Sequence, residues 1–292
     1  MALLKPSRLL AVLLILLGGA GFSIIAGVIK ILSTELHPFQ LVFLRTFLGM
    51  VWVSPFLVRK GLQTALVTDH LSLHILRSGA GILAMGCAFY ALSLLPMALV
   101  TAISFTTPLW MIGLAWLYLQ EYPGWLTGLA TIAGFAGVLI INPPVFKDLN
   151  IGWIAALCSP FFEAVVLVSV KRLTKTESVL NIMTTYGIIS TLFWLPVAIW
   201  VWQPISIHNL LLMVLVAGIA TLGQAATINA YAMAPATLIT PFYYVRLIFV
   251  SWVGFALLQE VPTWNTWMGA LVIVGCNVII VVNKGENSEQ NR

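Results

Sequence analysis

A glutamate and an arginine lie in the middle of two long apolar stretches of this sequence. Glu163 lies within residues 151–170, and Arg246 lies within residues 236–258. Each stretch can cross a bilayer, because about 20 residues at about 1.5 Å each span the hydrocarbon core. Insertion scales put the cost of a charge at that depth at about 2.5–3.5 kcal/mol, so such residues usually face a cavity or a partner. We therefore interpret both residues as parts of a substrate-binding site.

The two charges offer complementary chemistry. Arg246 keeps its proton and needs an anion or a strong acceptor nearby. The pair can hold a zwitterion, with a carboxylate on Arg246 and an ammonium group on Glu163, or the two side chains can neutralise each other in the core. A buried carboxyl group can also exchange a proton, so Glu163 is the candidate for proton coupling.

Other candidate substrate contacts are polar or aromatic residues of the apolar segments. Aromatic rings can flank a ring or a cation of the substrate; these candidates are Phe105, Trp110, Phe242, Tyr243 and Tyr244. The polar candidates are Tyr90, Thr107, Gln224 and Asn229. Arg45 lies nearer one end of its segment, and we expect it either to reach the outer interface or to guard an outer vestibule. Pro160 and Pro108 predict bends beside Glu163 and Thr107, because proline cannot donate a helical hydrogen bond.

The composition indicates which elements position these residues. The chain of 292 residues is 61% hydrophobic and 8% charged, with a mean hydropathy of +1.03, whereas charged residues make up about a quarter of a soluble domain. Continuous rather than alternating apolar runs exclude a β-barrel. The expected fold is therefore an all-α polytopic membrane protein with ten transmembrane helices. Its apolar runs are Leu9–Ile31, Phe39–Val58, Leu73–Leu95, Met97–Leu119, Trp125–Ile141, Ile151–Val170, Leu180–Trp202, Leu210–Ala232, Ala236–Leu258 and Trp264–Val282.

Basic residues predict the orientation of the chain. With the amino terminus in the cytoplasm, the cytoplasmic ends carry Lys5, Arg8, Arg59, Lys60, Arg77, Lys171, Arg172, Lys175, Lys284 and Arg292. The opposite side carries Lys30 and Lys147. This bias predicts a bacterial inner-membrane protein with both termini in the cytoplasm. It also accounts for the net charge of +5 without nucleic acid as a partner. The first apolar run continues to Ile31, which favours a spanning helix over a cleaved signal peptide.

The sequence contains an internal repeat. Leu119-Gln120-Glu121-Tyr122-Pro123-Gly124-Trp125 aligns with Leu258-Gln259-Glu260-Val261-Pro262-Thr263-Trp264, and Pro96 aligns with Pro235 in the same register. Residues 1–145 and 146–283 are thus predicted to be two five-helix repeats, followed by a disordered cytoplasmic tail over 284–292. An odd number of helices inverts the second repeat, which is typical of alternating-access transporters with a midplane site. We expect Glu121 and Glu260 to cap the helices that follow them.

Other chemistries find little support. His70 and His74 are four residues apart, but no third ligand has suitable spacing for a metal site. No glycine-rich phosphate loop is present, so we expect no ATP-driven pump and no bound cofactor. A membrane-embedded enzyme that used Glu163 as acid and base would need a companion nucleophile or metal at the same depth. A receptor would ordinarily need larger soluble loops than residues 59–72.

Motifs along nearly the whole chain resemble the drug/metabolite transporter superfamily, in its ten-helix EamA branch. The matching positions are Arg45 after His37-Pro38-Phe39, Leu76-Arg77, Tyr90-Ala91-Leu92, Leu95-Pro96, Ser104-Phe105-Thr106-Thr107-Pro108-Leu109, Leu119-Gln120-Glu121, Gly134 and Gly137, with Tyr231-Ala232, Ala234-Pro235, Pro241, Leu258-Gln259-Glu260 and Gly275 in the second half. The family more often has glycine than glutamine before the glutamate, and both halves depart from it alike. The resemblance implies two inverted EamA repeats and transport of small organic solutes. Within the branch, the chain is similar to bacterial carriers of S-adenosylmethionine and of riboflavin.

We therefore expect a secondary transporter of a small organic metabolite, not an enzyme. The substrate is expected to be amino-acid-like or nucleoside-like, with S-adenosylmethionine as the named candidate. The alternative is an exporter of amino acids, drugs or toxic metabolites. The other expected partner is the lipid bilayer, and the transporter is expected to be a monomer or a homodimer.

Overall fold

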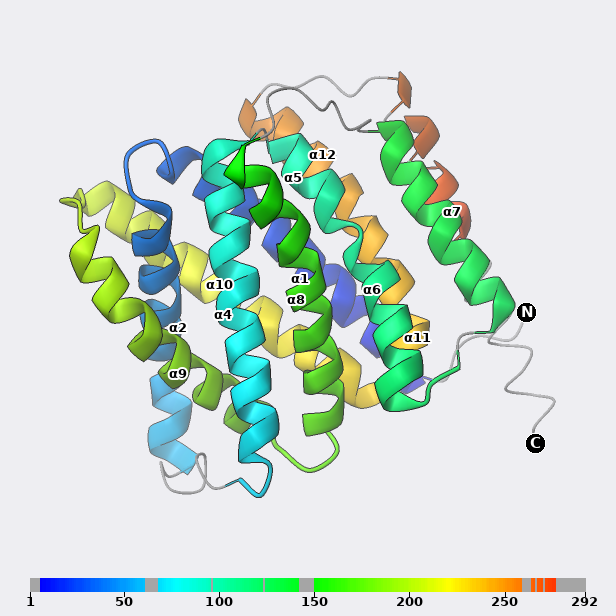
Figure 1. The fold of residues 1–292 in the computed structure, drawn as a ribbon, viewed down its shortest axis with the longest axis horizontal. Coiled ribbons are helices and arrows are strands. Elements are labelled where there is room, and N and C mark those ends of the chain that lie inside the picture. The colour runs from blue at the N-terminus through cyan, green and yellow to red at the C-terminus, as the bar shows by residue number, and fades with distance from the viewer. Residues whose placement is uncertain are drawn as a thin grey trace.

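The computed structural model of the chain describes residues 6–60, 68–95, 97–122, 124–141, 150–258, 264–265, 267–269 and 271–276. These residues form a bundle of helices, and none of them belongs to a β-strand. The long helices are α1 (Pro6–Leu32), α2 (Pro38–Lys60), α4 (Leu71–Leu94), α8 (Ile151–Leu173), α9 (Val179–Trp200) and α10 (Ile207–Met233). The shorter helix α7 (Trp125–Ile141) lies at one edge of the bundle (Figure 1).

Two transmembrane segments are interrupted at the positions where prolines occur. The first comprises α5 (Met97–Ser104), α6 (Thr107–Leu114) and the π-helical turn η1 (Ala115–Leu119). The second comprises α11 (Ala236–Ile239), the 3-10 turn η2 (Thr240–Val245) and α12 (Arg246–Leu258). Pro108 and Pro241 lie at the starts of α6 and η2, where a missing N–H group costs least. The structure thus has a full break where the sequence predicts a bend at Pro108, whereas α8 continues through Pro160.

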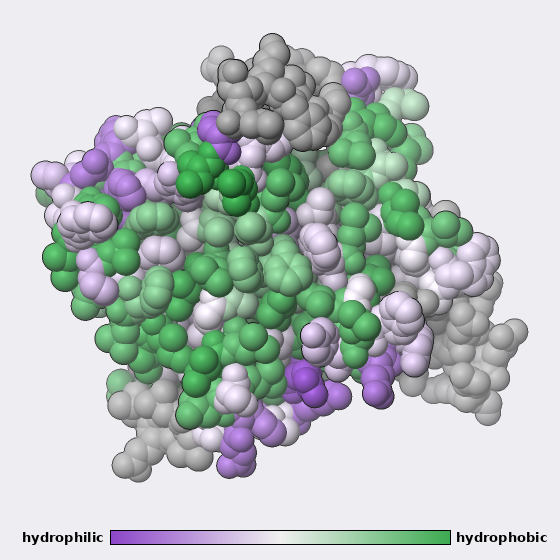
Figure 2. All heavy atoms as spheres, viewed as in Figure 1, coloured by the Kyte–Doolittle hydropathy of each residue, from purple (hydrophilic) through white to green (hydrophobic). Residues whose placement is uncertain are grey.

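Eight segments of the described chain are long and apolar enough to cross a membrane. Two shorter apolar helices, Trp125–Gly137 and Trp267–Cys276, correspond to the fifth and tenth predicted runs. Figure 2 shows hydrophobic side chains over the middle of one face and hydrophilic residues toward its upper and lower edges. The all-α polytopic class is therefore confirmed, and the number of ten spanning helices stays a prediction.

Helix pairs from distant parts of the sequence form the bundle. Helix α4 packs on α8, and α1 packs on α10 (Figure 1). Gly18 permits the close approach of α1 to α10, since a Cβ atom there would lie 3.2 Å from the carbonyl oxygen of Gly223. Glycines at such crossings are typical of membrane helices, where packing rather than water drives association.

One lysine in each half binds the end of a helix in the same way. The Lys30 ammonium group donates hydrogen bonds to the carbonyl oxygens of Leu92 (2.7 Å) and Leu95 (2.9 Å), at the end of α4. Lys171 likewise donates to the carbonyl oxygens of Tyr231 (2.7 Å) and Ala234 (2.8 Å), at the end of α10. Both lysines satisfy terminal carbonyl groups and favour the negative end of the helix dipole.

The Glu121 carboxylate contacts a helix of the other half of the chain, and its capping of the helix that follows it stays a prediction. It accepts a hydrogen bond from the backbone N–H group of Thr237 (3.3 Å), in the first turn of α11. The preceding residue, Gln120, has a left-handed backbone (φ 55°) that turns the chain at this point. Glu121 therefore joins the two halves of the chain, a contact that local sequence could not predict. Gln259 and Glu260 are the expected counterparts of Gln120 and Glu121 in the second repeat. They lie outside the described residues.

Candidate functional site

A cavity of about 240 Å³ lies inside the bundle, between helices from both halves of the chain. Most of its wall is apolar, and its charged lining residues are Arg45, Arg77, Glu163 and Arg246. Three arginines against one glutamate give the wall an excess of positive charge. Charges at this depth require partners or a function, because each is costly to bury alone.

Glu163, in the cavity wall, has two hydrogen-bond donors. The Tyr243 hydroxyl group donates to one carboxylate oxygen, and the Thr107 hydroxyl group donates to the other over 3.2 Å. Thr107 begins α6 and Tyr243 lies in η2, so both interrupted segments supply a donor. Tyr243 and Glu163 line the cavity directly.

Helix α8 brings Glu163 to this position. It runs from Ile151 to Leu173 with a proline at residue 160. Beside the proline, the Ser159 hydroxyl group donates to the carbonyl oxygen of Ala84 in α4 (2.9 Å). This contact fixes α8 against α4 one turn before Glu163, where the proline removes one backbone hydrogen bond of the helix.

Arg246 is close to the glutamate in the wall but is not paired with it. The single ion pair within 4.0 Å among the described residues joins His74 and Glu177. The Arg246 guanidinium group lies 5.8 Å from the ring centre of Phe22 and 6.0 Å from that of Tyr243, at the limit of cation–π contact. Its Nε atom is buried without a hydrogen-bond partner. Arg246 therefore retains the capacity to bind an anion.

The other two arginines meet at a second part of the wall. Arg45, on α2, is 8% exposed and donates to the amide oxygen of Gln224 on α10 (3.2 Å). Arg77, on α4, is 3% exposed, and its guanidinium carbon lies 3.9 Å from the ring centre of Tyr186 on α9. Tyr186 also interacts with Arg45, and the two arginines interact electrostatically. The Nε and Nη1 atoms of Arg77 are buried without partners.

A glycine leaves room for the tyrosine that contacts these arginines. A Cβ atom at Gly81 would lie 2.8 Å from the Tyr186 ring, closer than real contacts allow. Gly81 is about one helical turn after Arg77 on α4, so the absence of a side chain there lets the ring approach the helix beside the guanidinium group. The local sequence of α4 thus creates the place for an aromatic side chain from α9.

Six of the twelve predicted site residues lie at the cavity or contact a residue that does. Glu163, Arg246, Tyr243, Gln224 and Arg45 line the cavity, and Thr107 bonds to Glu163 from behind. Arg45 is more deeply buried than its position along the helix indicates, because α4 and α10 cover it. It contacts Gln224, so it does not reach the interface.

The remaining six predicted site residues are not among the residues that line this cavity. One of them, Phe242, is buried in a cluster of apolar side chains. Phe105 and Tyr244 pack on each other with ring centres 6.0 Å apart, and Tyr90 stacks on Phe39 at 5.7 Å. Trp110 is 48% exposed at the outside of the bundle and packs on Phe161. The Asn229 amide group donates to the carbonyl oxygen of Ala225 in its own helix (2.8 Å). Helix rotation, which segment-level hydropathy does not specify, separates these residues from the cavity.

Sequence reasoning missed Arg77 and Tyr186. The sequence placed Arg77 at the cytoplasmic end of its segment, and that orientation stays a prediction. The structure adds that Arg77 is buried in the cavity wall, six residues after the start of α4. Its spacing of four residues from Gly81 was the available signal. Tyr186 lay in an apolar run with no feature that distinguished it from packing.

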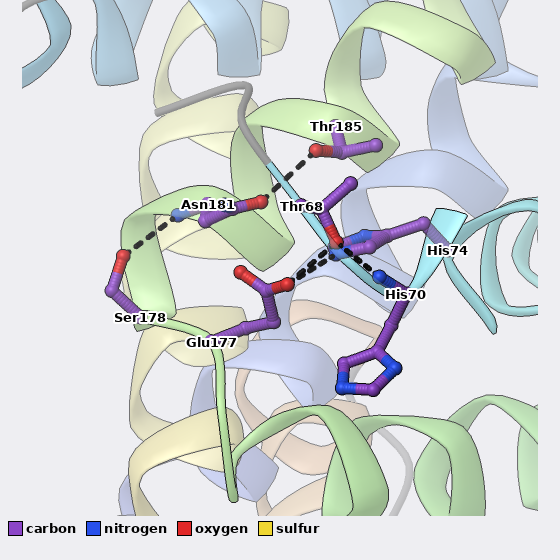
Figure 3. Close-up of polar contacts among 7 residues, drawn as sticks. All are labelled: Thr68, His70, His74, Glu177, Ser178, Asn181 and Thr185. Atoms are coloured by element: carbon purple, nitrogen blue, oxygen red, sulfur yellow. Dashed lines mark hydrogen bonds and ion pairs between the residues drawn. The ribbon is translucent and has the colours of Figure 1, made fainter. Parts of the chain in front are cut away.

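A polar cluster outside the cavity joins two connecting loops (Figure 3). Glu177, between α8 and α9, lies 3.8 Å from His74 and accepts a hydrogen bond from the Thr68 hydroxyl group at 2.5 Å. The His74 ring points toward Glu177 and the His70 ring points away from it. Within the described part of the chain, no three His, Cys, Asp or Glu residues are grouped as metal ligands.

Known proteins resemble this chain over most of its length. Residues 9–142 match the model of the EamA-like transporter family. The S-adenosylmethionine uptake transporter of Rickettsia bellii is 28% identical over 255 residues, which are 87% of each chain. The riboflavin transporter of Vibrio cholerae is 28% identical over 275 residues, 93% of this chain and 92% of that protein.

A third relative and one solved structure extend the comparison. The pseudopaline exporter CntI of Pseudomonas aeruginosa is 24% identical over 289 residues, 97% of this chain and 99% of that protein. A crystal structure with 15% sequence identity superimposes with a TM-score of 0.75 over 97% of this chain and 98% of that one. The structural likeness extends over the whole bundle, and at this identity it concerns the fold alone.

Proposed function

We propose that this chain belongs to the drug/metabolite transporter superfamily, since residues 9–142 match the EamA-like transporter family and named transporters match most of its length. On that premise, its cavity carries a small organic metabolite across the membrane. The observation that carries the proposal is the set of charged side chains around a cavity inside an apolar bundle. Since burying such charges is costly without a ligand or partner, their presence around an internal space supports transport of a charged or zwitterionic solute.

The proposed substrate is amino-acid-like or nucleoside-like. Its carboxylate binds Arg246, which has no carboxylate within 4.0 Å in the part of the chain that the structure describes, and its ammonium group binds Glu163. S-adenosylmethionine is the named candidate, because relatives with that transport activity match 87% of the chain. The aromatic rings of Phe22 and Tyr243 beside Arg246 offer surfaces for an apolar or cyclic part.

We propose that transport proceeds by alternating access between inverted repeats at residues 1–145 and 146–283. Two observations support this proposal. The matched lysine contacts at the ends of α4 and α10 occur once in each half, and both halves contain an interrupted segment whose break supplies a donor to Glu163. Binding between two inverted halves permits access from either side as one half rocks against the other.

The membrane context follows the charge bias of the sequence. We propose a location in the bacterial inner membrane with both termini in the cytoplasm and the tail over 284–292 on that side. Coupling to protons at Glu163, action as a monomer or homodimer, and the absence of enzymatic activity belong to the same proposal.

Export is the second candidate direction. The pseudopaline exporter matches 97% of this chain, as completely as the uptake relatives do. An exporter of amino acids, drugs or toxic metabolites would use the same cavity, since the wall chemistry selects the solute and not its direction.

Counterflow in proteoliposomes tests the proposal. The purified chain is reconstituted with labelled S-adenosylmethionine, riboflavin and amino acids, each in turn. We expect saturable exchange of at least one solute, and reduced exchange in Glu163→Gln and Arg246→Ala. Arg59→Gln is the matched control, because Arg59 is exposed at the end of α2. Normal exchange in both site variants would overturn the assignment of the site.

A further inference from the structure

The Arg45–Arg77 part of the cavity wall has positive charge without any negative partner. Both side chains are at least nine-tenths buried, and neither has a carboxylate oxygen within 4.0 Å among the described residues. Arg77 uses the Tyr186 ring as a cation–π partner and leaves Nε and Nη1 unbonded. Two like charges held together in an apolar bundle are unfavourable unless an anion binds them.

Nearby acids do not supply that anion. Glu163 already accepts hydrogen bonds from Tyr243 and Thr107. Glu177, in the loop before α9, is engaged by His74 and Thr68 at the cluster of Figure 3. The polar partners of Arg45 in the described part of the chain are the neutral amide of Gln224 and the hydroxyl group of Tyr186. The unmet donors of Arg77 therefore belong to a residue that lines the cavity, where a solute can reach it.

We propose that Arg45 and Arg77 form a second anion-binding subsite of the cavity, so that the substrate carries a carboxylate or phosphate group in addition to the carboxylate assigned to Arg246. Guanidinium groups bind both kinds of oxyanion through paired, charge-assisted hydrogen bonds. The inference rests on the proposed transport function and narrows its substrate class to anionic amino-acid-like or nucleoside-like metabolites. S-adenosylmethionine, with one carboxylate and two cationic groups, satisfies one subsite only.

Matched ligand pairs test the subsite by binding to the purified full chain in detergent. The pairs are glutamate and glutamine, and riboflavin 5′-phosphate and riboflavin, with inorganic phosphate and malonate as minimal anions at constant ionic strength. The readouts are the ligand-induced rise in thermal midpoint and the dissociation constant. We expect the anionic member of at least one pair to bind about tenfold tighter, since one charge-assisted contact contributes about that much.

Variants assign the discrimination to these arginines. In Arg77→Gln and Arg45→Gln, the preference for the anion should fall toward equality while the neutral member binds as before. Arg77→Lys should retain part of the preference, and Arg59→Gln all of it. Ligand-free melts report folding: a substrate subsite predicts an unchanged or higher midpoint for Arg77→Gln, whereas a structural arginine predicts a lower one.

The outcomes separate the subsite from transport itself. If no anion stabilises the wild type more than Arg77→Gln, or if Arg77→Gln keeps the full preference, the subsite proposal is wrong. Counterflow of the bound ligands then tests transport independently. Anion-selective binding without exchange would support the subsite and contradict the proposed function. Exchange without anion preference would support the proposed function and contradict the subsite.

Discussion

Two regions of the cavity wall differ in how their charged groups are bonded. In the first, the Glu163 carboxylate has a hydroxyl donor on each oxygen, from Tyr243 and Thr107. In the second, Arg77 keeps two nitrogen atoms without hydrogen-bond partners, and Arg45 has the neutral partners Gln224 and Tyr186. The protein supplies hydrogen-bond partners to the acid, whereas the arginines form the proposed anion subsite.

This difference in bonding indicates a different role for each of the two regions. A carboxylate with two fixed donors has a defined orientation, and the interrupted segments that supply the donors can move it. Unpartnered guanidinium groups instead store an unfavourable charge that a bound anion relieves. Substitutions around Glu163 should therefore change stability as well as transport. Substitutions around Arg45 and Arg77 should change selectivity.

Removal of the acid gives the largest expected effect. Glu163→Ala leaves the hydroxyl groups of Tyr243 and Thr107 without an acceptor and removes the proposed ammonium contact. We expect counterflow to fall by about 100-fold, since two or more charge-assisted hydrogen bonds are lost at about 1.5–3 kcal/mol each. Exchange at half the normal rate or more would mean that Glu163 is a structural residue.

Loss of one donor should have a smaller effect. Tyr243→Phe keeps the ring beside Arg246 and removes one hydrogen bond to Glu163. We expect counterflow to fall by about tenfold, as one bond to a charged acceptor contributes about 1.5–3 kcal/mol. Tyr122→Phe, at an exposed tyrosine, is the control. If Tyr243 acts through Glu163, then adding Tyr243→Phe to Glu163→Gln should cause little further loss.

The region around Arg45 and Arg77 can be altered by a substitution at Gly81. In Gly81→Ala the new methyl group meets the Tyr186 ring, which must move from under Arg77. Overpacking of this kind costs about 1–3 kcal/mol, so we expect a lower thermal midpoint and a weaker preference for anions. Gly79→Ala, two residues earlier on α4, meets no atom within 4 Å and should be close to wild type. Equal behaviour of the two variants would contradict the positioning role of Gly81.

Loss of the weaker donor gives the smallest expected effect. Thr107→Val removes the 3.2 Å hydrogen bond to Glu163, whereas Thr106→Val removes a bond to the carbonyl oxygen of Ile103 within one helical turn. We expect Thr107→Val to lower stability by about 1 kcal/mol and counterflow by a few-fold. The Thr106 variant should leave counterflow unchanged. A larger transport defect in Thr106→Val would reverse the assigned roles.

The sequence predicted the fold class, which is confirmed, and a resemblance to the drug/metabolite transporter superfamily, which the family match over residues 9–142 and the transporter relatives support. Long apolar runs specify helices, because every backbone polar group in lipid must be bonded within its own segment. Runs of this kind do not specify helix rotation. Trp110 and Tyr244 were therefore grouped with Tyr243 on sequence grounds, although the first lies outside the bundle and the second packs on Phe105.

A central position in an apolar run identified Glu163 and Arg246, which both line the cavity. This criterion did not identify Arg77 as a lining residue, because a charge near the start of a predicted helix resembles one that only orients the helix in the membrane. The contact of Tyr186 with Arg77 joins α9 to α4, so no local pattern could have revealed it.

The sequence by itself determined that this chain is a helical membrane protein that resembles the drug/metabolite transporter superfamily, and that a few charges lie within its apolar segments. Hydropathy is a property of each segment, so it can be determined from the sequence without knowing which segments pack together. Only the tertiary structure decided which residues lie beside each buried charge. Each interrupted segment supplies a hydroxyl donor to Glu163, and Arg45 and Arg77 come together from separate helices. Side-chain contacts between helices depend on rotation and crossing, which packing of the whole bundle fixes.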